Sequence, residues 1–142
     1  MARTFRIRSM DDEGQEEFFA LASEIFPRSK IRLLEKDEVL MAYEGESADP
    51  DGRPVGFVHL RPKEGSFYLQ GIGVLPDFRH EGLGRELLQI ALKKTMAVFG
   101  EGGLSLKVRA ANAEAVRLYL STGFSLERFS EKTWTLRWKP LN

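Results

Sequence analysis

The sequence predicts an α+β domain built on one mixed, twisted β-sheet, and three observations lead to this prediction. In the first half of the chain, short runs of β-forming residues are separated by turn formers, which is typical of antiparallel hairpins. A strand at 66–75, a helix at 82–99 and a strand at 104–109 then give two parallel strands joined by a right-handed crossover. After a helix at 113–122, two short strands at 124–129 and 133–139 complete the sheet.

Length and composition indicate one globular domain, residues 1–142, because such a chain buries about 68–70% of its unfolded surface around a single core. There is no run of 18 apolar residues and no basic-then-apolar leader, so we expect no membrane partner and no signal peptide. Cysteine is absent, which excludes disulfides, thiolate metal sites and a cysteine nucleophile. We therefore expect a cytoplasmic protein without a metal.

The two halves of the chain carry opposite charge, although the net charge is zero. Residues 1–71 contain 10 Lys/Arg and 14 Asp/Glu, a balance of −4, and residues 72–142 contain 11 and 7, a balance of +4. This asymmetry is consistent with an anionic cofactor and a cationic acceptor, and scattered surface charge explains it equally well. No lysine and arginine cluster is interleaved with aromatic residues, so we expect no nucleic-acid partner.

In the first half, a helix is predicted after Asp11 and Asp12, which cap its N-terminus. Pro27 is predicted to end this helix. The segment 28–37 is predicted as a short second helix or a loop. The strands predicted in this half are 4–8, 39–44 and 55–61, with a turn-rich loop at 45–54.

The central strand leads into a glycine-bearing turn that opens the helix at 82–99. The turn reads Arg79-His80-Glu81-Gly82-Leu83-Gly84-Arg85. Glycine lets a ligand approach the backbone, and the first N–H groups of a helix have no intrahelical acceptor, so this layout is typical of an anion site. The residues after Gly84 exclude a P-loop, and the glycine count excludes a dinucleotide fingerprint. The sequence therefore predicts a diphosphate cradle made by the N–H groups of 80–85 and the guanidinium of Arg79 or Arg85.

This turn, after a strand that ends Val74-Leu75-Pro76, resembles the coenzyme A signature R/Q-x-x-G-x-G/A of the GNAT family of N-acetyltransferases. A second family pattern, V-x-x-x-N-x-x-A-x-x-L-Y-x-x-x-G-F, begins downstream at Val108. The resemblance implies a GNAT-like, mostly antiparallel twisted sheet of about six to seven strands flanked by about four helices, with the strand-helix-strand unit binding coenzyme A at its centre. It also implies acetyl-CoA as a co-substrate and a primary amine as the acceptor, acetylated by direct attack in a ternary complex.

The resemblance further implies that the central strand separates from its neighbour and exposes backbone groups near Ile72, Gly73 and Val74. The pantetheine arm is expected to pair with this edge, and a nearby N–H to stabilise the oxyanion. Gly71 and Gly73 suit a bulge in such a strand, and loosening of the strand is the alternative interpretation.

On the last helix, Asn112 is predicted to cap the N-terminus, and the resemblance adds a contact with the coenzyme. Tyr119 is the predicted catalytic residue, which returns a proton to the thiolate or hydrogen-bonds its sulfur. The side chains of His80 and Glu81 are expected to be solvated, so that these residues act through their backbone.

The general base is not assigned by the resemblance, because the chain departs from the family at two positions. Gln70 stands where many members have a carboxylate, and Lys107 stands where the bacterial enzymes that acetylate a ribosomal protein have glutamate. An ordered water, with Tyr68, Gln70 or Glu24 behind it, is the remaining candidate, and His59 is a remote one.

Without a dedicated base, an acceptor of low pKa is favoured. Neutralising a lysine amine at pH 7 costs about 4.6 kcal/mol, and an α-amine only about 1–1.4 kcal/mol. We therefore expect an α-amine, as in a peptide N-terminus, or another low-pKa amine such as an amino sugar. The alternative is a non-catalytic acyl-CoA-binding or sensing module.

Four apolar residues near the end of the chain are expected to pack either in a homodimer or in the monomer's core: Phe129, Trp134, Leu136 and Trp138.

Overall fold

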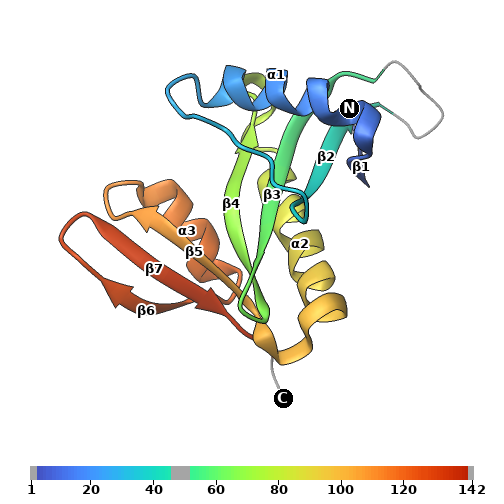
Figure 1. Ribbon diagram of the computed structural model, residues 1–142. Coiled ribbons are helices and arrows are strands. Elements are labelled where there is room, and N and C mark those ends of the chain that lie inside the picture. The colour runs from blue at the N-terminus through green and yellow to red at the C-terminus, as the bar shows by residue number, and fades with distance from the viewer. Residues whose placement is uncertain (1–2, 46–51, 141–142) are drawn as a thin grey trace.

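One seven-stranded mixed sheet organises the computed structural model, which describes residues 3–45 and 52–140. The strand order is β1-β2-β3-β4-β5-β7-β6, and only the β4–β5 pair is parallel (Figure 1). The predicted mixed sheet is therefore confirmed, and most of the predicted loop at 45–54 lies outside the described residues. The strands are β1 (Phe5–Ser9), β2 (Glu38–Glu44), β3 (Pro54–Lys63), β4 (Ser66–Val74), β5 (Leu104–Arg109), β6 (Ser125–Phe129) and β7 (Thr133–Trp138).

Three α-helices cover the described part of the sheet, one fewer than the four expected. Three 3₁₀ turns accompany them, η1 (Asp12–Gly14), η2 (Pro76–Phe78) and η3 (Gly100–Gly102). Asp11 accepts a hydrogen bond from the N–H of Gly14, which confirms a cap ahead of the first helix. The α-helices are α1 (Gln15–Ile25), α2 (Leu83–Phe99) and α3 (Ala113–Ser121).

The segment 26–37 contains no helix, so the part at 28–37, for which a short helix or a loop was predicted, is a loop. Its backbone groups bond to side chains instead: the N–H of Leu34 donates to Asp37 Oδ2, and the carbonyl of Arg32 accepts from Arg61 Nη2. A backbone whose donors and acceptors are satisfied in this way does not need a helical ladder.

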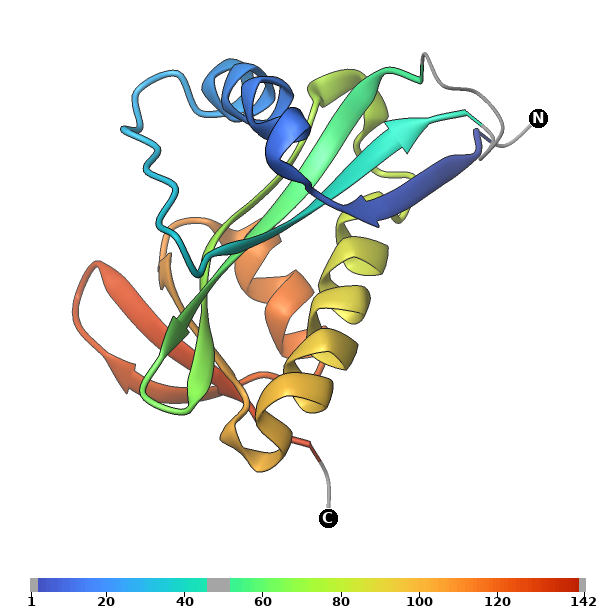
Figure 2. The same cartoon turned by 45° about the vertical axis from the view of Figure 1, so that its right-hand side comes forward.

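The helices lie on opposite faces of the sheet, α1 on one and α2 on the other, with α3 beside α2 (Figure 2). Alternation along β3 fits this arrangement. A Cβ added at Gly56 would meet Leu83 and Leu87 of α2, whereas the ring of the next residue, Phe57, packs edge-on against Phe18 of α1. The face that α1 covers is called the α1 face below.

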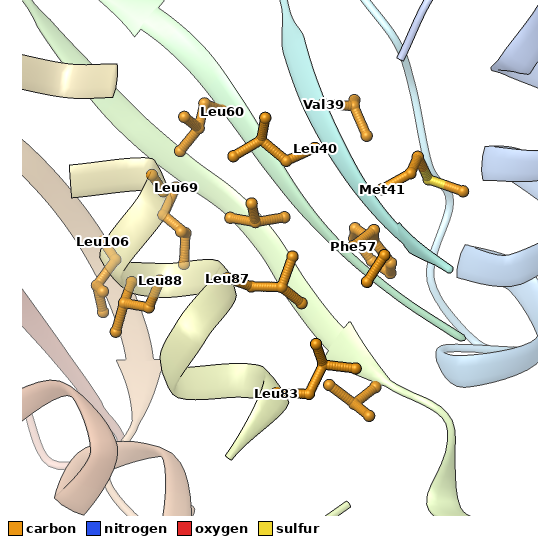
Figure 3. Close-up of a cluster of buried hydrophobic side chains, with 14 of the residues drawn as sticks. Val39, Leu40, Met41, Phe57, Leu60, Leu69, Leu83, Leu87, Leu88 and Leu106 are labelled. Carbon is orange, nitrogen blue, oxygen red and sulfur yellow. The ribbon is translucent and has the colours of Figure 1, made fainter. Parts of the chain in front are cut away.

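The core lies mainly between α2 and the sheet. Leu83, Leu87 and Leu88 are nearly or fully buried and point toward strand residues such as Leu60 and Leu69 (Figure 3). This spacing puts one apolar stripe of α2 on the sheet, and each fully buried leucine contributes roughly 1.5–3 kcal/mol relative to exposure. Burial of this stripe therefore fixes α2, and with it the start of α2, against β3 and β4.

The last strands divide their apolar residues between core and surface. Leu136 is fully buried, and Trp134 and Trp138 pack partly buried against the core. Phe129 of β6, at the sheet edge, is 72% exposed. Three of the four apolar residues, for which the sequence allowed either a homodimer or the monomer's core, thus pack in the monomer's core.

No helix in the described ranges is long and apolar enough to cross a membrane.

Gly73 is a position where packing requires glycine. An added Cβ would lie 2.9 Å from Ile25 Cγ2 and 3.0 Å from Phe26 Cε2, so these side chains would have to shift. We expect Gly73→Ala to lower the free energy of unfolding by about 1–3 kcal/mol. Urea denaturation measures the change. The matched control is Gly71→Ala on the same strand, whose nearest contact would be Phe57 at 3.6 Å; equal stability of the two variants would contradict this packing argument.

Candidate active site

The parallel strands β4 and β5 are paired at only two positions, Phe67 with Leu104 and Tyr68 with Ser105. Beyond Tyr68 the two strands diverge (Figure 1), and β4 continues to pair only with β3. Within the described residues, the edge of β4 at 69–74 that faces β5 therefore has no strand partner. The predicted separation of the central strand is confirmed, and an extended chain of amides can pair with such an edge.

A β-bulge lies where this open edge begins. His59 of β3 is opposite Gly71, but the next residue, Leu60, is opposite Leu69, so Gln70 has no partner on β3. The predicted bulge is thus confirmed, at the residue before Gly71. A bulge bends its strand and increases the local twist, which helps β4 to leave β5.

The turn after β4 brings the start of α2 to the end of the open edge. Two of its residues have left-handed backbone, His80 with φ 65° and Gly82 with φ 84°. Glu86 donates its N–H to the carbonyl of Gly82, so the N–H groups of residues 83–85 have no acceptor inside the helix. These donors and the positive end of the helix dipole form an anion-binding geometry, as the sequence predicts.

Glycine at position 84 is not required by the protein's own packing. A Cβ there would meet only Leu118 Cδ2, at 4.0 Å, and its φ is not positive. The space beside the helix start is therefore open to a ligand that lies against the backbone. At Gly71, on the open edge, an added Cβ would instead contact the Phe57 ring at 3.6 Å. The helix start therefore fits the close approach that a coenzyme would need.

The two candidate arginines lie on either side of this helix start. Arg79 donates from Nε to the carbonyl of Val74 (2.9 Å), and Arg85 donates from Nη2 to Ser121 Oγ (2.8 Å). Each bond uses one of the five N–H donors of a guanidinium, so both groups keep donors for an anion. The side chain of His80 is 77% exposed, in agreement with the expectation from sequence.

Side chains of Glu81 and Asn112 have structural partners. The carboxylate of Glu81 lies 3.3 Å from Arg3 Nη1 in an exposed pair. Asn112 Oδ1 accepts from the N–H of Ala115 (3.2 Å), which confirms the predicted cap of α3. Its contact with a coenzyme stays a prediction.

Tyr119, the predicted catalytic residue, is 5% exposed and packs against Phe124 with ring centroids 5.6 Å apart. Burial raises the pKa of its phenol to about 12. Within the described residues its hydroxyl has no hydrogen-bond partner. A phenol of this pKa stays protonated at neutral pH and donates a hydrogen bond more readily than it releases a proton.

The three residues predicted to hold a base water come from two elements, Tyr68 and Gln70 from β4 and Glu24 from α1. Gln70 is exposed at the bulge, and Glu24 is exposed on α1. Tyr68 is half-buried; burial raises the pKa of its phenol, and a hydrogen bond from the backbone N–H of Lys107 partly opposes this. That bond joins β4 to β5 just where the strands begin to diverge.

Sequence reasoning missed a buried polar cluster on the α1 face, formed by Asp37, His59 and Arg61. Arg61 binds Asp37 with two bonds, Nε to Oδ1 (2.9 Å) and Nη2 to Oδ2 (2.7 Å), and His59 Nε2 lies 2.7 Å from Asp37 Oδ2. The Asp37 and His59 side chains are 1% and 5% exposed. The β2–β3 register places Glu38 opposite Leu60 and hence Asp37 beside Arg61. The sequence alone would have predicted the pairing of Asp37 with Arg61 only if the β2–β3 register had been known.

The cluster fixes the charge states of its members. Burial raises the pKa of Asp37, but the hydrogen bonds from Arg61, the Leu34 N–H and His59 outweigh it and lower this pKa to about 2. Burial lowers the pKa of His59 despite the opposing effect of Asp37. Because an ionised carboxylate only accepts, His59 Nε2 carries the hydrogen of the bond to Asp37. Among the described residues, no three His, Asp or Glu side chains form a metal-type group.

Solved structures identify the class of fold. The chain aligns over 96% of its length with the ribosomal-protein-S18-alanine N-acetyltransferase of Escherichia coli, at a TM-score of 0.78 and 20% identity, covering 94% of that chain. A GNAT family acetyltransferase from Elizabethkingia anophelis with acetyl-CoA bound aligns over 96% of this chain and 98% of that one, with a TM-score of 0.78 and 16% identity. The fold is that of the GNAT acetyltransferases.

Sequence comparison supplies the family. The model of the acetyltransferase (GNAT) family matches residues 6–124, and the chain therefore belongs to this family. The catalytic subunit ard1 of the N-terminal acetyltransferase A complex of Schizosaccharomyces pombe is 33% identical over 82 residues, 54% of this chain and 46% of that protein. An N-alpha-acetyltransferase of Sulfurisphaera tokodaii is 32% identical over 89 residues, 54% of this chain and 53% of that protein. The matched region thus spans about half the length of each of these curated relatives.

The Asp37 cluster makes a pH dependence of stability measurable. The pKa of Asp37 is about 2 in the folded protein and about 3.9 in an unfolded chain, so its ionised form stabilises the fold above pH 4 by roughly 2–3 kcal/mol. This contribution is lost as the pH falls from 4 through 2. We expect the free energy of unfolding to fall more steeply over this range in the wild type than in Asp37→Asn.

Urea denaturation at a series of pH values between 2 and 5 tests this expectation. The control is Asp12→Asn, which changes an exposed aspartate near the start of α1 and should keep the wild-type slope. Parallel curves for the wild type and Asp37→Asn would show that Asp37 is not stabilised in its ionised form.

Proposed function

We propose that the protein is an acetyl-CoA-dependent N-acetyltransferase that acetylates a primary amine by direct attack in a ternary complex. One observation carries the proposal: the open edge of β4 at 69–74 ends where the free N–H groups of α2 begin. An amide-containing arm and a diphosphate, joined in one molecule, match these two neighbouring features.

In this proposal the diphosphate of the coenzyme lies at the start of α2, bound by N–H groups of residues 80–85 and by Arg79 or Arg85. The pantetheine arm runs along β4 near Ile72, Gly73 and Val74, and Asn112 contacts the coenzyme from α3. The open space at Gly84 supports this placement, because a ligand can reach the backbone there.

The amine nitrogen attacks the thioester carbonyl, the carbon–sulfur bond breaks, and the coenzyme leaves as a thiolate. A backbone N–H of β4 near Ile72 or Val74 stabilises the negative oxygen that forms during attack. Tyr119 donates a hydrogen bond to the sulfur, and its raised pKa favours this role over full proton transfer. The proton released by the amine passes to water held near Tyr68, Gln70 or Glu24.

The proposed acceptor is an α-amine, as at a peptide N-terminus. An α-amine loses its proton at pH 7 for about 1–1.4 kcal/mol, against about 4.6 kcal/mol for lysine, which suits a site without an assigned base. Three relatives carry names that specify N-terminal substrates or α-amines: the S. pombe subunit, the S. tokodaii enzyme and the [ribosomal protein bS18]-alanine N-acetyltransferase of E. coli, which is 44% identical over 57 residues, 40% of this chain and 38% of that protein.

A non-catalytic acyl-CoA-binding module is the second candidate. It is favoured by Gln70 and Lys107, which replace carboxylates that serve as bases in the family. A homodimer through the edge strand β6, with its exposed Phe129, and a cytoplasmic location are predictions that accompany either function.

Thiol release from acetyl-CoA with a panel of α-amino peptides, amino sugars, lysine and polyamines tests the proposal. We expect turnover to be fastest with α-amino peptides. Tyr119→Phe should lower kcat by roughly tenfold to a hundredfold, because one hydrogen bond to the leaving sulfur is lost, and should leave the Kd of coenzyme A nearly unchanged.

Phe124→Leu is the control for loss of packing around Tyr119, and it should retain most of kcat. Fast lysine acetylation without α-amine turnover would contradict the acceptor. Coenzyme binding without any thiol release would favour the non-catalytic module.

Gly84→Asp separates ligand binding from folding. The added Cβ meets nothing closer than 4.0 Å in the protein, and a carboxylate in the first turn of a helix is favourable by about 0.3–1 kcal/mol, so stability should stay close to that of the wild type. The Kd for acetyl-CoA should rise tenfold or more, because the carboxylate places a negative charge beside the proposed diphosphate. Gly84→Ala is the control, since the family signature accepts alanine at this position, and it should keep the Kd within a few-fold. Calorimetric titration and urea denaturation measure the two effects, and unchanged affinity of Gly84→Asp would contradict the cradle.

A further inference from the structure

The segment 26–37 crosses the α1 face of the sheet between the end of α1 and the start of β2 (Figures 1 and 2). It has neither helix nor strand. Few hydrogen bonds within the segment hold it: the N–H of Ser29 donates to Phe26, and the N–H of Asp37 donates to Leu34. Its shape must therefore depend on contacts with the sheet.

Apolar contacts contribute, since Ile31 and Leu33 pack partly buried against the core, and the polar contacts come from two residues of β3. Arg61 binds both oxygens of Asp37 and also the carbonyl of Arg32, so one guanidinium joins two points of the segment. His59 binds Asp37 Oδ2, and its ring packs edge-on against Phe18 of α1 with centroids 5.4 Å apart. Asp37 in turn accepts the N–H of Leu34. The three side chains together anchor the segment to β3 and α1.

This anchor lies next to the proposed reaction centre. His59 is opposite Gly71 on β4, directly after the bulge, and Gly71 faces Phe57 on the α1 face. The other face of β4 is covered by α2. A molecule bound along the open edge of β4 is therefore approached by a second substrate from the α1 face, which the segment 26–37 borders.

We propose that Asp37, His59 and Arg61 are positioning residues that hold the segment 26–37 as one wall of the acceptor site and so set the affinity for the amine. The inference rests on the proposed N-acetyltransferase function and deepens it. None of the three residues touches the coenzyme in this proposal. The bidentate Arg61–Asp37 pair supplies a fixed geometry that one charge contact would not.

Arg61→Gln and Arg61→Lys test the proposal by kinetics and by amide hydrogen exchange. In Arg61→Gln the KM for the acceptor should rise tenfold or more, while the KM for acetyl-CoA stays within twofold. The acceptor probe is a tetrapeptide with a free N-terminal alanine. Exchange of the Leu34 N–H should become at least tenfold faster, and exchange across α2 should not change. Arg61→Lys retains the charge but loses the two-pronged geometry, so it should restore the acceptor KM only in part.

Arg137→Gln is a matched control. Arg137 is also a strand arginine that binds one carboxylate, Glu127, and one carbonyl, that of Gly102. Its side chain is 27% exposed against 24% for Arg61, and it lies on β7, away from the segment. This variant should leave both KM values and the exchange of Leu34 unchanged. If Arg61→Gln does not fold, Arg61→Lys, which keeps the charge beside Asp37, carries the test.

The outcomes separate this inference from the function on which it rests. A wild type that acetylates the peptide, with Arg61 variants whose acceptor KM is unchanged, would overturn the positioning role alone. Faster exchange with an unchanged acceptor KM would do the same, since the anchor would then be only structural. A wild type that releases no thiol with any amine would overturn the proposed function and, with it, this inference.

Discussion

The early end of the β4–β5 pairing is the constraint on which the rest of the structure depends. After two paired positions, β4 must satisfy one edge without a neighbouring strand. The bulge at Gln70 and the close packing of α1 on Gly73 bend β4 away and hold it there. The result is a backbone edge that is open to a ligand within an otherwise continuous sheet.

Helix α2 links this edge to the anion-binding turn. Its buried leucine stripe packs on β3 and β4, and its first N–H groups lie where β4 ends. A short turn with left-handed His80 and Gly82 connects the two. Because rigid elements hold both features, a ligand that uses both needs little reorganisation of the protein. In the proposed function, the sheet and helix therefore bind the coenzyme mainly through backbone groups, and few side chains are required.

The α1 face is organised differently, by side chains. A buried carboxylate is costly unless it is paired, and Asp37 is paired by Arg61, His59 and a backbone N–H at once. This pairing takes the place of the helix that the segment 26–37 lacks. A segment held by one polar cluster and a few apolar contacts, such as those of Ile31 and Leu33, can differ in sequence and course without disturbing the sheet.

The sequence alone determined where the strands and the three α-helices lie along the chain, the single mixed sheet, the glycine-bearing turn before α2 and the cap at Asn112, because these depend on local periodicity and on motifs of adjacent residues. Only the tertiary structure decided that Gln70 is the bulged residue, that Phe57 adjoins Gly71 on the α1 face, and that Asp37 meets His59 and Arg61. The reason is that strand register and side-chain burial come from long-range packing, since a slip of one residue sends each side chain to the other face. Asp37 and His59 therefore resemble ordinary loop and strand residues in the sequence and become a buried cluster only in the fold.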